Sequence, residues 1–318
     1  MDAPFFIVGN DRSGTTMLRM ILDRGPDAAI PPESMFLTDV ELPPADWQAL
    51  MDEVWAHPKV RLWELPGEAP RVPPGLDRAE AARFVLGAPF EAYARKYGKP
   101  RWGDKTPHYV HHIDRLLGIW PHARVVILVR DGRDVALSLR RMPFGPNNAW
   151  AAAEWWARGI RAGAAAQERH PDTVLTVRYE DLARDPATYV PPVCEFLDLT
   201  YRPDMLDLAE ADWSRIVADQ RSWFPTLFDG INTKAVGRWE REMPVRDQAV
   251  FAALAHEELA RFGYPVPDRP LPPPTARQAA LYHRHNELMR NVNFVRLRVF
   301  QERGRELRLA LKRRMSRA

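Results

Sequence analysis

The sequence is poor in several features that would each point to a particular class of protein. It contains one cysteine, Cys194, so it can form neither an internal disulfide nor a thiolate metal cluster, which suits a reducing compartment. No apolar stretch approaches the roughly 18 residues that span a bilayer. The N-terminus has no basic segment ahead of an apolar one, so we expect no signal peptide. These absences favour a cytoplasmic location.

Positive charge is also scarce outside the C-terminal tail. Residues 277–318 contain 12 Lys and Arg against 3 Asp and Glu, a net charge of +9, whereas the other 276 residues carry 33 against 39, or −6. A main domain that is not cationic is a poor general nucleic-acid binder, and we expect no such partner. The tail predicts a basic amphipathic helix, which could pack on its own chain, contact another subunit or lie peripherally on an anionic membrane.

Short apolar segments alternate with helical ones over most of the chain. The apolar pattern predicts strands at 4–8, 124–129 and 173–178, and helices at 15–24, 78–97, 111–119, 134–141, 148–169 and 191–197. Residues 40–75, rich in Pro and Trp, should be irregular or only briefly helical. This alternation predicts an α/β fold with a central parallel sheet flanked by helices. We expect a main domain over 1–264, a proline-rich linker over 265–275 and a helical C-terminal extension over 276–318.

The segment from Gly9 to Thr16, Gly-Asn-Asp-Arg-Ser-Gly-Thr-Thr, lies between the first predicted strand and helix. It has the glycine frame of a Walker A loop, but Thr15 stands where that loop has its phosphate-binding lysine. Successive N–H groups and the helix N-terminus still suit a phosphate, and Arg12 supplies a cation inside the loop. A 5′-phosphate ester with a second anionic group suits this loop better than ATP. An ordinary strand–helix turn is the plain alternative.

A second cationic motif, Val129-Arg-Asp-Gly-Arg-Asp-Val-Ala-Leu-Ser138, follows the predicted central strand. It places Arg130 at the carboxyl end of the strand and Ser138 in the next helix. Ligands of open α/β sheets bind at that edge, and arginine holds phosphate oxygens by charge-assisted hydrogen bonds. Arg130 is therefore a candidate phosphate ligand, and a surface turn is the alternative.

The two motifs, in this order, resemble those of sulfotransferases that use 3′-phosphoadenosine 5′-phosphosulfate (PAPS), in particular the branch with tyrosylprotein sulfotransferases and many bacterial members. The resemblance covers residues 4–262. It implies a P-loop NTPase-like sulfotransferase fold, transfer of a sulfuryl group to an acceptor hydroxyl, PAPS as donor, 3′,5′-adenosine bisphosphate (PAP) as product and no metal requirement. It assigns the 5′-phosphosulfate to Arg12, Ser13, Gly14, Thr15 and Thr16, and the 3′-phosphate to Arg130 and Ser138. The tyrosylprotein enzymes place another arginine four residues after this serine, where this chain has Met142.

The same resemblance implies catalytic residues. Glu33, in Ile30-Pro-Pro-Glu-Ser, matches the general base that accepts the proton of the attacking hydroxyl. Lys105, in Arg101-Trp-Gly-Asp-Lys-Thr-Pro, matches the lysine that stabilises charge on the bridging oxygen of the leaving group. By themselves these would be a solvated loop glutamate and a surface lysine. The resemblance also assigns Tyr179 to the adenine side and Arg238 to the loop that closes over the nucleotide. Ser222 is a candidate for a second leaving-group stabiliser.

Two clusters have simpler explanations. His108 and His112 have a spacing that could bind a metal, and histidine could act as a base, but no third ligand is evident, so we interpret them with His111 as supporting or surface residues. Trp150, Trp155 and Trp156 could line an acceptor site for an aromatic ring or a sugar. On a helix between strands they more often belong to the core.

Two other functions remain open from the sequence. A P-loop kinase acting on a nucleotide or small molecule would bind ATP with Mg²⁺, and Thr15 in the lysine position argues against it. A non-catalytic protein that binds a partner through its tail would bind nucleotide without turnover, or not at all. The acceptor is equally open: a small molecule, a carbohydrate, a lipid or tyrosine would each supply a hydroxyl.

Overall fold

The computed structural model describes residues 3–140, 142, 145–211, 229–269 and 271–315. The chain divides into two compact units. The first consists of Met1–Arg130 with Gly159–Val236, and the second of Asp131–Arg158 with Gly237–Ala318.

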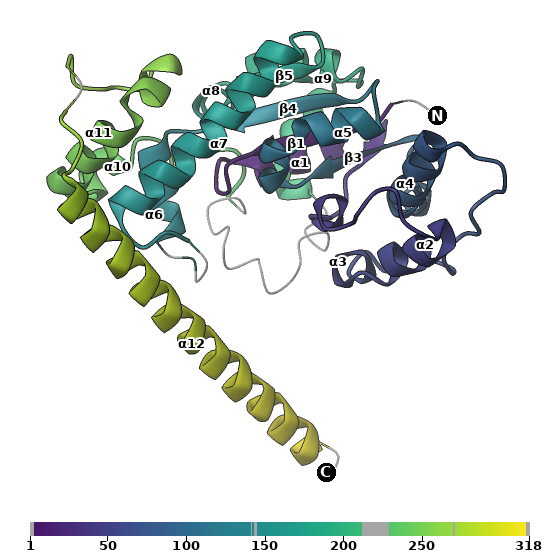
Figure 1. Cartoon of the computed structure of the whole chain (residues 1–318). Helices are drawn as coiled ribbons and strands as arrows, with labels where there is room; N and C mark the ends of the chain where they lie inside the picture. The colour runs from purple at the N-terminus through teal and green to yellow at the C-terminus, as the bar shows by residue number, and fades with distance from the viewer. Residues whose placement is uncertain (1–2, 141, 143–144, 212–228, 270, 316–318) are drawn as a thin grey trace. The chain divides into compact units, whose positions relative to one another are not determined.

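A five-stranded sheet forms the centre of the first unit (Figure 1). Its strands are β1 (Phe5–Gly9), β2 (Ala28–Ala29), β3 (Arg101–Lys105), β4 (Arg124–Val129) and β5 (Val174–Arg178). Their order is β2-β3-β1-β4-β5 and every pair is parallel, with Val8 opposite Ile127 and Val129 opposite Arg178. The predicted α/β fold with a central parallel sheet is therefore confirmed. Because all strands run the same way, their carboxyl ends share one edge, as ligand sites in such sheets require.

The two central strands are buried on both faces. Phe5 and Ile7 pack in one apolar cluster with α1 (Thr15–Asp23), α8 (Tyr179–Arg184) and α9 (Pro186–Phe196). Phe6 faces the other way and contacts Trp102 and Trp120, with ring centroids 6.0 and 5.6 Å away. Helices therefore cover both faces of the sheet, as Figure 1 shows. The continuous apolar runs of β1 and β4 have this cause, because neither strand has a solvent-facing side.

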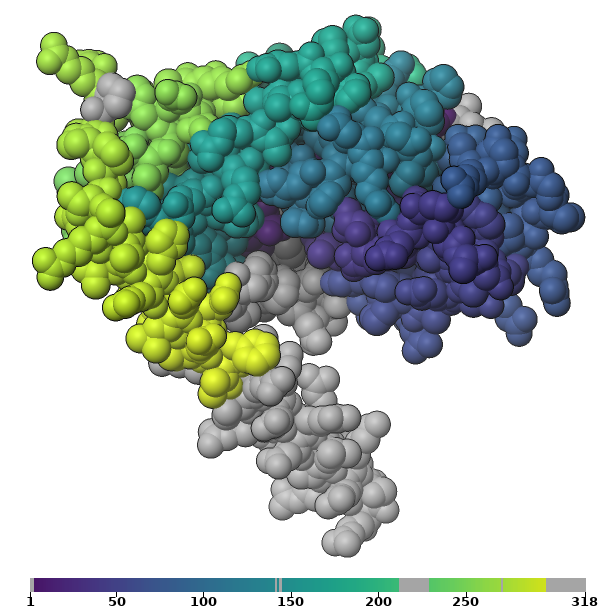
Figure 2. All heavy atoms as spheres, in the orientation of Figure 1, coloured from purple at the N-terminus to yellow at the C-terminus, as the bar shows by residue number. Residues whose placement is uncertain are grey.

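The remaining elements of the first unit precede or flank the strands. They are η1 (Phe36–Thr38), α2 (Trp47–Ala56), α3 (Pro58–Arg61), α4 (Arg78–Lys96), η2 (Pro107–His111), α5 (Ile113–Ile119), η3 (Pro203–Leu206) and η4 (Leu208–Glu210). The segment 40–75 is more helical than expected, because Asp46 caps α2 by accepting hydrogen bonds from the Gln48 and Ala49 N–H groups. In Figure 2 this segment forms a continuous purple and dark-blue surface.

The second unit is helical. It contains α6 (Gly132–Leu139), the first half of α7 (Ala149–Arg169), α10 (Trp239–Glu242), α11 (Val245–Arg261) and α12 (Ala276–Met315). Trp156 is fully buried against Phe251, and Trp150 stacks on Tyr282 of α12, so the core interpretation of these two tryptophans holds. The helical C-terminal extension is confirmed. Of the helices that the structure describes, none combines the length and apolar content needed to cross a membrane.

Candidate active site

The loop between β1 and α1 turns through two left-handed backbone positions. Arg12 has φ 69° and Gly14, the residue before α1, has φ 91°. A Cβ atom at Gly14 would lie 2.2 Å from the ring of Tyr179, so both the backbone angle and the packing require glycine there. The Ser13 N–H donates to the Asn10 carbonyl at 3.2 Å and closes the turn. The loop therefore has a fixed shape at the N-terminus of α1.

Several polar groups of this loop suit an anion. Burial and the nearby Arg130 guanidinium lower the pKa of Arg12 to about 10, because two like charges lie in a poorly solvated place. Arg130 donates to the Arg12 carbonyl at 3.0 Å and lies over the Tyr179 ring, 4.7 Å from its centroid. The hydroxyl of Ser13 is buried and makes no hydrogen bond to the described residues. The loop, Arg130 and Tyr179 thus converge on one place, and its donor groups fit a phosphate or phosphosulfate.

Glu33 and Lys105 meet in the same unit. Lys105 ends β3, its side chain is 6% exposed, and its ammonium donates to the Glu33 carboxylate at 2.6 Å. Burial by itself would raise the pKa of Glu33, but the charge and hydrogen bond of Lys105 outweigh burial and hold that pKa below the usual value. Glu33 is therefore ionised at neutral pH. The sequence did not predict β3, because Arg101-Trp-Gly-Asp-Lys is polar and contains glycine, although all five residues are buried.

The segment that carries Glu33 is held by α1 as well as by β3. Arg19 is buried and its Nε donates to the Ile30 carbonyl at 2.9 Å, while the Ile30 N–H donates to Asp23 Oδ1, also at 2.9 Å. On the far side of Glu33, the Ser34 N–H donates to Thr106 Oγ1 at 3.1 Å. Glu33 therefore lies between two segments that are held by hydrogen bonds, at Ile30 and at Ser34, and these bonds fix the backbone on either side of it.

Asp11 is a residue of this site that the sequence reasoning missed. Burial raises its pKa, the nearby Glu33 carboxylate raises it further, and Lys105, His108 and Arg12 act in the opposite direction. Asp11 therefore lies within electrostatic reach of both the Arg12 loop and the Glu33–Lys105 pair. The only signal in the sequence was its position next to Arg12 inside the loop.

The other predicted nucleotide ligands, Ser138 and Arg238, belong to the second unit. Ser138 is half-buried in α6. Arg238 forms an ion pair with Glu242 at 2.5 Å, and this hydrogen bond raises the pKa of Arg238. Asp134, which the sequence reasoning passed over, accepts hydrogen bonds from the Gly237 and Trp239 N–H groups at 2.7 and 2.9 Å. It holds the segment that carries Arg238, but the role of Ser138 and Arg238 toward a donor stays a prediction.

Of the remaining candidates, His108 lies near the site, since its charge lowers the pKa of Asp11. The rings of His108, His111 and His112 cluster together, with His108 5.5 and 5.4 Å from the other two. Among the residues that the structure describes, no group of three or more His, Cys, Asp or Glu side chains could hold a metal ion. Ser222 lies outside the described residues.

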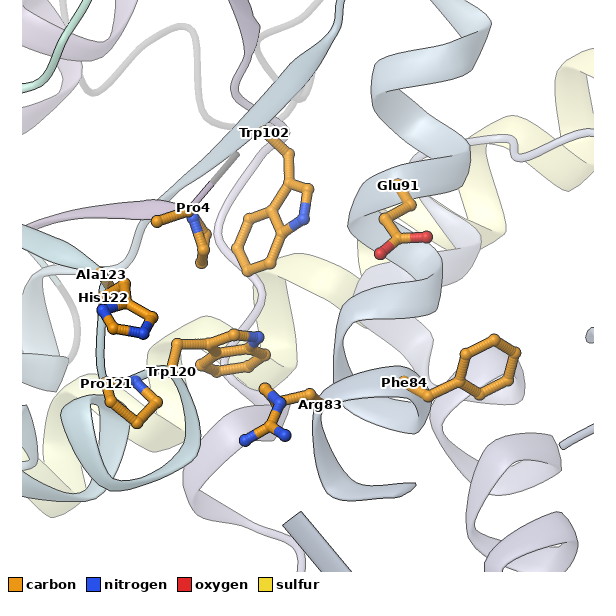
Figure 3. Close-up of a pocket in the computed structure, with 10 residues that line it drawn as sticks. Pro4, Arg83, Phe84, Glu91, Trp102, Trp120, Pro121, His122 and Ala123 are labelled. Carbon is orange, nitrogen blue, oxygen red and sulfur yellow. The ribbon is translucent and has the colours of Figure 1, made fainter. Parts of the chain in front are cut away.

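A cavity of about 630 Å³ lies at the other edge of the sheet, by the residues that precede β1 and β4 (Figure 3). The rings of Trp102 and Trp120 and the carboxylate of Glu91 border it, and burial raises the pKa of Glu91. No residue of the Arg12 loop or the Glu33–Lys105 pair lines this cavity. It is distinct from the candidate active site.

The sequence and the fold are similar to those of known sulfotransferases. The chain is 26% identical over 277 residues to protein-tyrosine sulfotransferase 1 of Danio rerio, covering 81% of this chain and 71% of the relative. It is 24% identical over 196 residues to 3-alpha-hydroxysteroid sulfotransferase of Cavia porcellus, covering 51% of this chain and 66% of the relative. The sulfotransferase domain from the curacin biosynthetic pathway shares the fold, with a TM-score of 0.57 at 19% identity over 84% of this chain and 99% of that domain. The model of the sulfotransferase family matches residues 4–203, and the chain belongs to that family.

Proposed function

We propose that the chain transfers the sulfuryl group of PAPS to an acceptor hydroxyl, with Glu33 as general base. Membership of the sulfotransferase family supports sulfuryl transfer in general. The proposal of a glutamate base rests on one observation: Lys105 Nζ lies 2.6 Å from Glu33 Oε1. The loop that contains Arg12, whose donor groups suit an anion, belongs to the same unit. A base for the acceptor and a cation for the leaving group are the two functions that this reaction requires from the protein.

The bound donor would supply an electrophilic sulfur and a phosphate leaving group. Glu33 removes the proton of the acceptor hydroxyl as the acceptor oxygen bonds to sulfur. The bond from sulfur to the 5′-phosphate oxygen breaks in line, and its electron pair stays on that oxygen. Lys105 stabilises the resulting negative charge. Arg12 to Thr16 and Arg130 would hold the donor, and the resemblance adds Ser138, Tyr179 and Arg238.

The ion pair couples the two catalytic groups. In this structure the Lys105 ammonium keeps the pKa of Glu33 low, which makes the carboxylate a weak base. If Lys105 turns its ammonium to a phosphate oxygen, Glu33 loses that partner while it stays partly buried, and its pKa rises. Glu33 therefore becomes a stronger base only once an anion occupies the site, which would disfavour proton abstraction without the donor.

The acceptor is a hydroxyl compound of a class that the site does not define. One relative is named for protein tyrosine and another for a 3-alpha-hydroxysteroid. We therefore propose a hydroxyl-bearing acceptor and test both kinds. The single cysteine is a buried free thiol, which fits the proposed cytoplasmic location, and the tail from 276 is proposed to contact a membrane surface or a subunit.

Two measurements test the function. Calorimetry should show PAP binding without Mg²⁺, and ³⁵S-labelled PAPS should label a tyrosine peptide or a 3-alpha-hydroxysteroid. Glu33→Gln should lower kcat by about a hundredfold or more without weakening PAP binding, whereas the matched variant Glu257→Gln, at an exposed position on α11, should not. Absence of PAP binding would refute the donor, and Mg²⁺-dependent ATP binding would favour a kinase. Full turnover by Glu33→Gln would remove only the base assignment.

A further inference from the structure

A row of buried hydroxyl groups lies directly behind the Glu33–Lys105 pair. Ser34, Thr106 and Tyr109 are each 0% exposed, and so is Asp104, the residue before Lys105. Ser34 follows Glu33 in the sequence, and Asp104 and Thr106 are the residues before and after Lys105. Glu33 and Lys105 lie 72 residues apart in the chain, so contacts between their two segments must keep the two side chains next to each other.

The hydroxyl groups form one connected chain of hydrogen bonds. The Leu37 N–H donates to the Tyr109 oxygen at 3.0 Å, and the Tyr109 and Ser34 hydroxyls are 2.9 Å apart. Ser34 Oγ lies 3.3 Å from Thr106 Oγ1, which donates to Asp104 Oδ1, also at 3.3 Å. Every hydroxyl proton has an acceptor when the chain runs in one direction, from Tyr109 through Ser34 and Thr106 to Asp104.

We propose that Ser34, Thr106 and Tyr109, with Asp104 as their terminal acceptor, are positioning residues that hold Glu33 against Lys105. This inference rests on the proposed function of that pair. Strand alternation directs Asp104 and Lys105 to opposite sides of β3, so anchoring one sets the orientation of the other. The Ser34 N–H and Oγ both bond to Thr106, which fixes the backbone next to Glu33. Within the described part of the chain, neither the Glu33 nor the Lys105 side chain makes a second hydrogen bond that could hold the pair in place of the network.

Asp104 can act as the terminal acceptor of the network whether it is protonated or ionised. Burial raises its pKa to about 7, and the neighbouring Thr106 and Ser34 hydroxyls lower it only in part. Asp104 Oδ2 has no hydrogen-bond partner among the described residues, whereas Oδ1 accepts from Thr106. A proton on Oδ2 would leave Oδ1 able to accept, so the network persists whether or not Asp104 is ionised. The same protein can therefore keep the pair aligned on both sides of neutral pH.

Matched variants separate positioning from simple loss of structure. Thr106→Val keeps the shape and removes the hydroxyl, while Thr106→Ser keeps the hydroxyl and removes the methyl group. Tyr109→Phe removes the first hydroxyl of the network, which also accepts a hydrogen bond from the Leu37 N–H. With labelled PAPS and the acceptor found for the wild type, we expect Thr106→Val and Tyr109→Phe to lower kcat by about tenfold or more. Donor KM and PAP affinity should stay unchanged, and Thr106→Ser should recover most of kcat.

A double-mutant cycle gives the decisive comparison. In a Glu33→Gln background there is no base left to align, so Tyr109→Phe should cost much less than in the wild type. Equal losses in both backgrounds, or full kcat in Thr106→Val and Tyr109→Phe, would overturn the inference. These outcomes differ from failure of the proposed function, in which the wild type itself binds no PAP and labels no acceptor.

Discussion

Replacing Asp104 by asparagine should make the free energy of unfolding less dependent on pH. Asp104 is fully buried, and burial raises its pKa from the ordinary 3.8 to about 7. Between these values Asp104 holds a proton in the folded protein that it releases in the unfolded chain, so its contribution to the stability falls as pH rises and levels off above about 7. The whole shift corresponds to about 4 kcal/mol, of which about 3 kcal/mol falls between about pH 5 and about pH 8.5.

Asparagine keeps the oxygen that accepts from Thr106 but cannot ionise. Guanidinium denaturation of Asp104→Asn and of the wild type over this pH range gives the free energy of unfolding of each protein. As pH rises, the value for the variant should increase relative to that for the wild type by about 3 kcal/mol. Other titrating groups cancel in the difference, and the exposed Asp172→Asn serves as the control. If the free energies of unfolding of the two proteins changed in parallel with pH, the pKa of Asp104 would not be raised in the folded protein.

Three further outcomes follow from other parts of the fold. Gly14→Ala should abolish PAP binding in calorimetry, because the left-handed backbone costs an L-residue about 1–2 kcal/mol and its Cβ would lie 2.2 Å from the Tyr179 ring; unchanged affinity would contradict the loop assignment. Asp134→Ala should speed hydrogen exchange at the Gly237 and Trp239 amides, since each loses its acceptor. Deleting residues 276–318 should lower Tm by uncovering Trp150 but leave PAP affinity intact, and loss of binding would count against an accessory tail.

The sequence was sufficient for the parts of the protein whose signals are local. The apolar run at 124–129 matched β4 residue for residue, and the glycine frame at 9–14 placed the loop between β1 and α1. β3 was missed because four of its five buried residues are charged or glycine, and burial of charged residues depends on partners elsewhere in the chain. Asp11 was missed for a similar reason, since an acidic residue beside an anion-binding loop has meaning only once its neighbours are known.

Local patterns were enough to indicate the family, the order of the motifs at 9–16 and 129–138 and the alternation of strands and helices, because each depends on residues close together in the chain. The three-dimensional fold was needed to see that Glu33 and Lys105 form a pair, that Arg130 contacts the Arg12 loop, and that a buried hydroxyl network lies behind the pair. These contacts join segments 72 to 118 residues apart. Such pairings arise when a parallel sheet brings the ends of distant strands to one edge, and no local pattern specifies which side chains then meet.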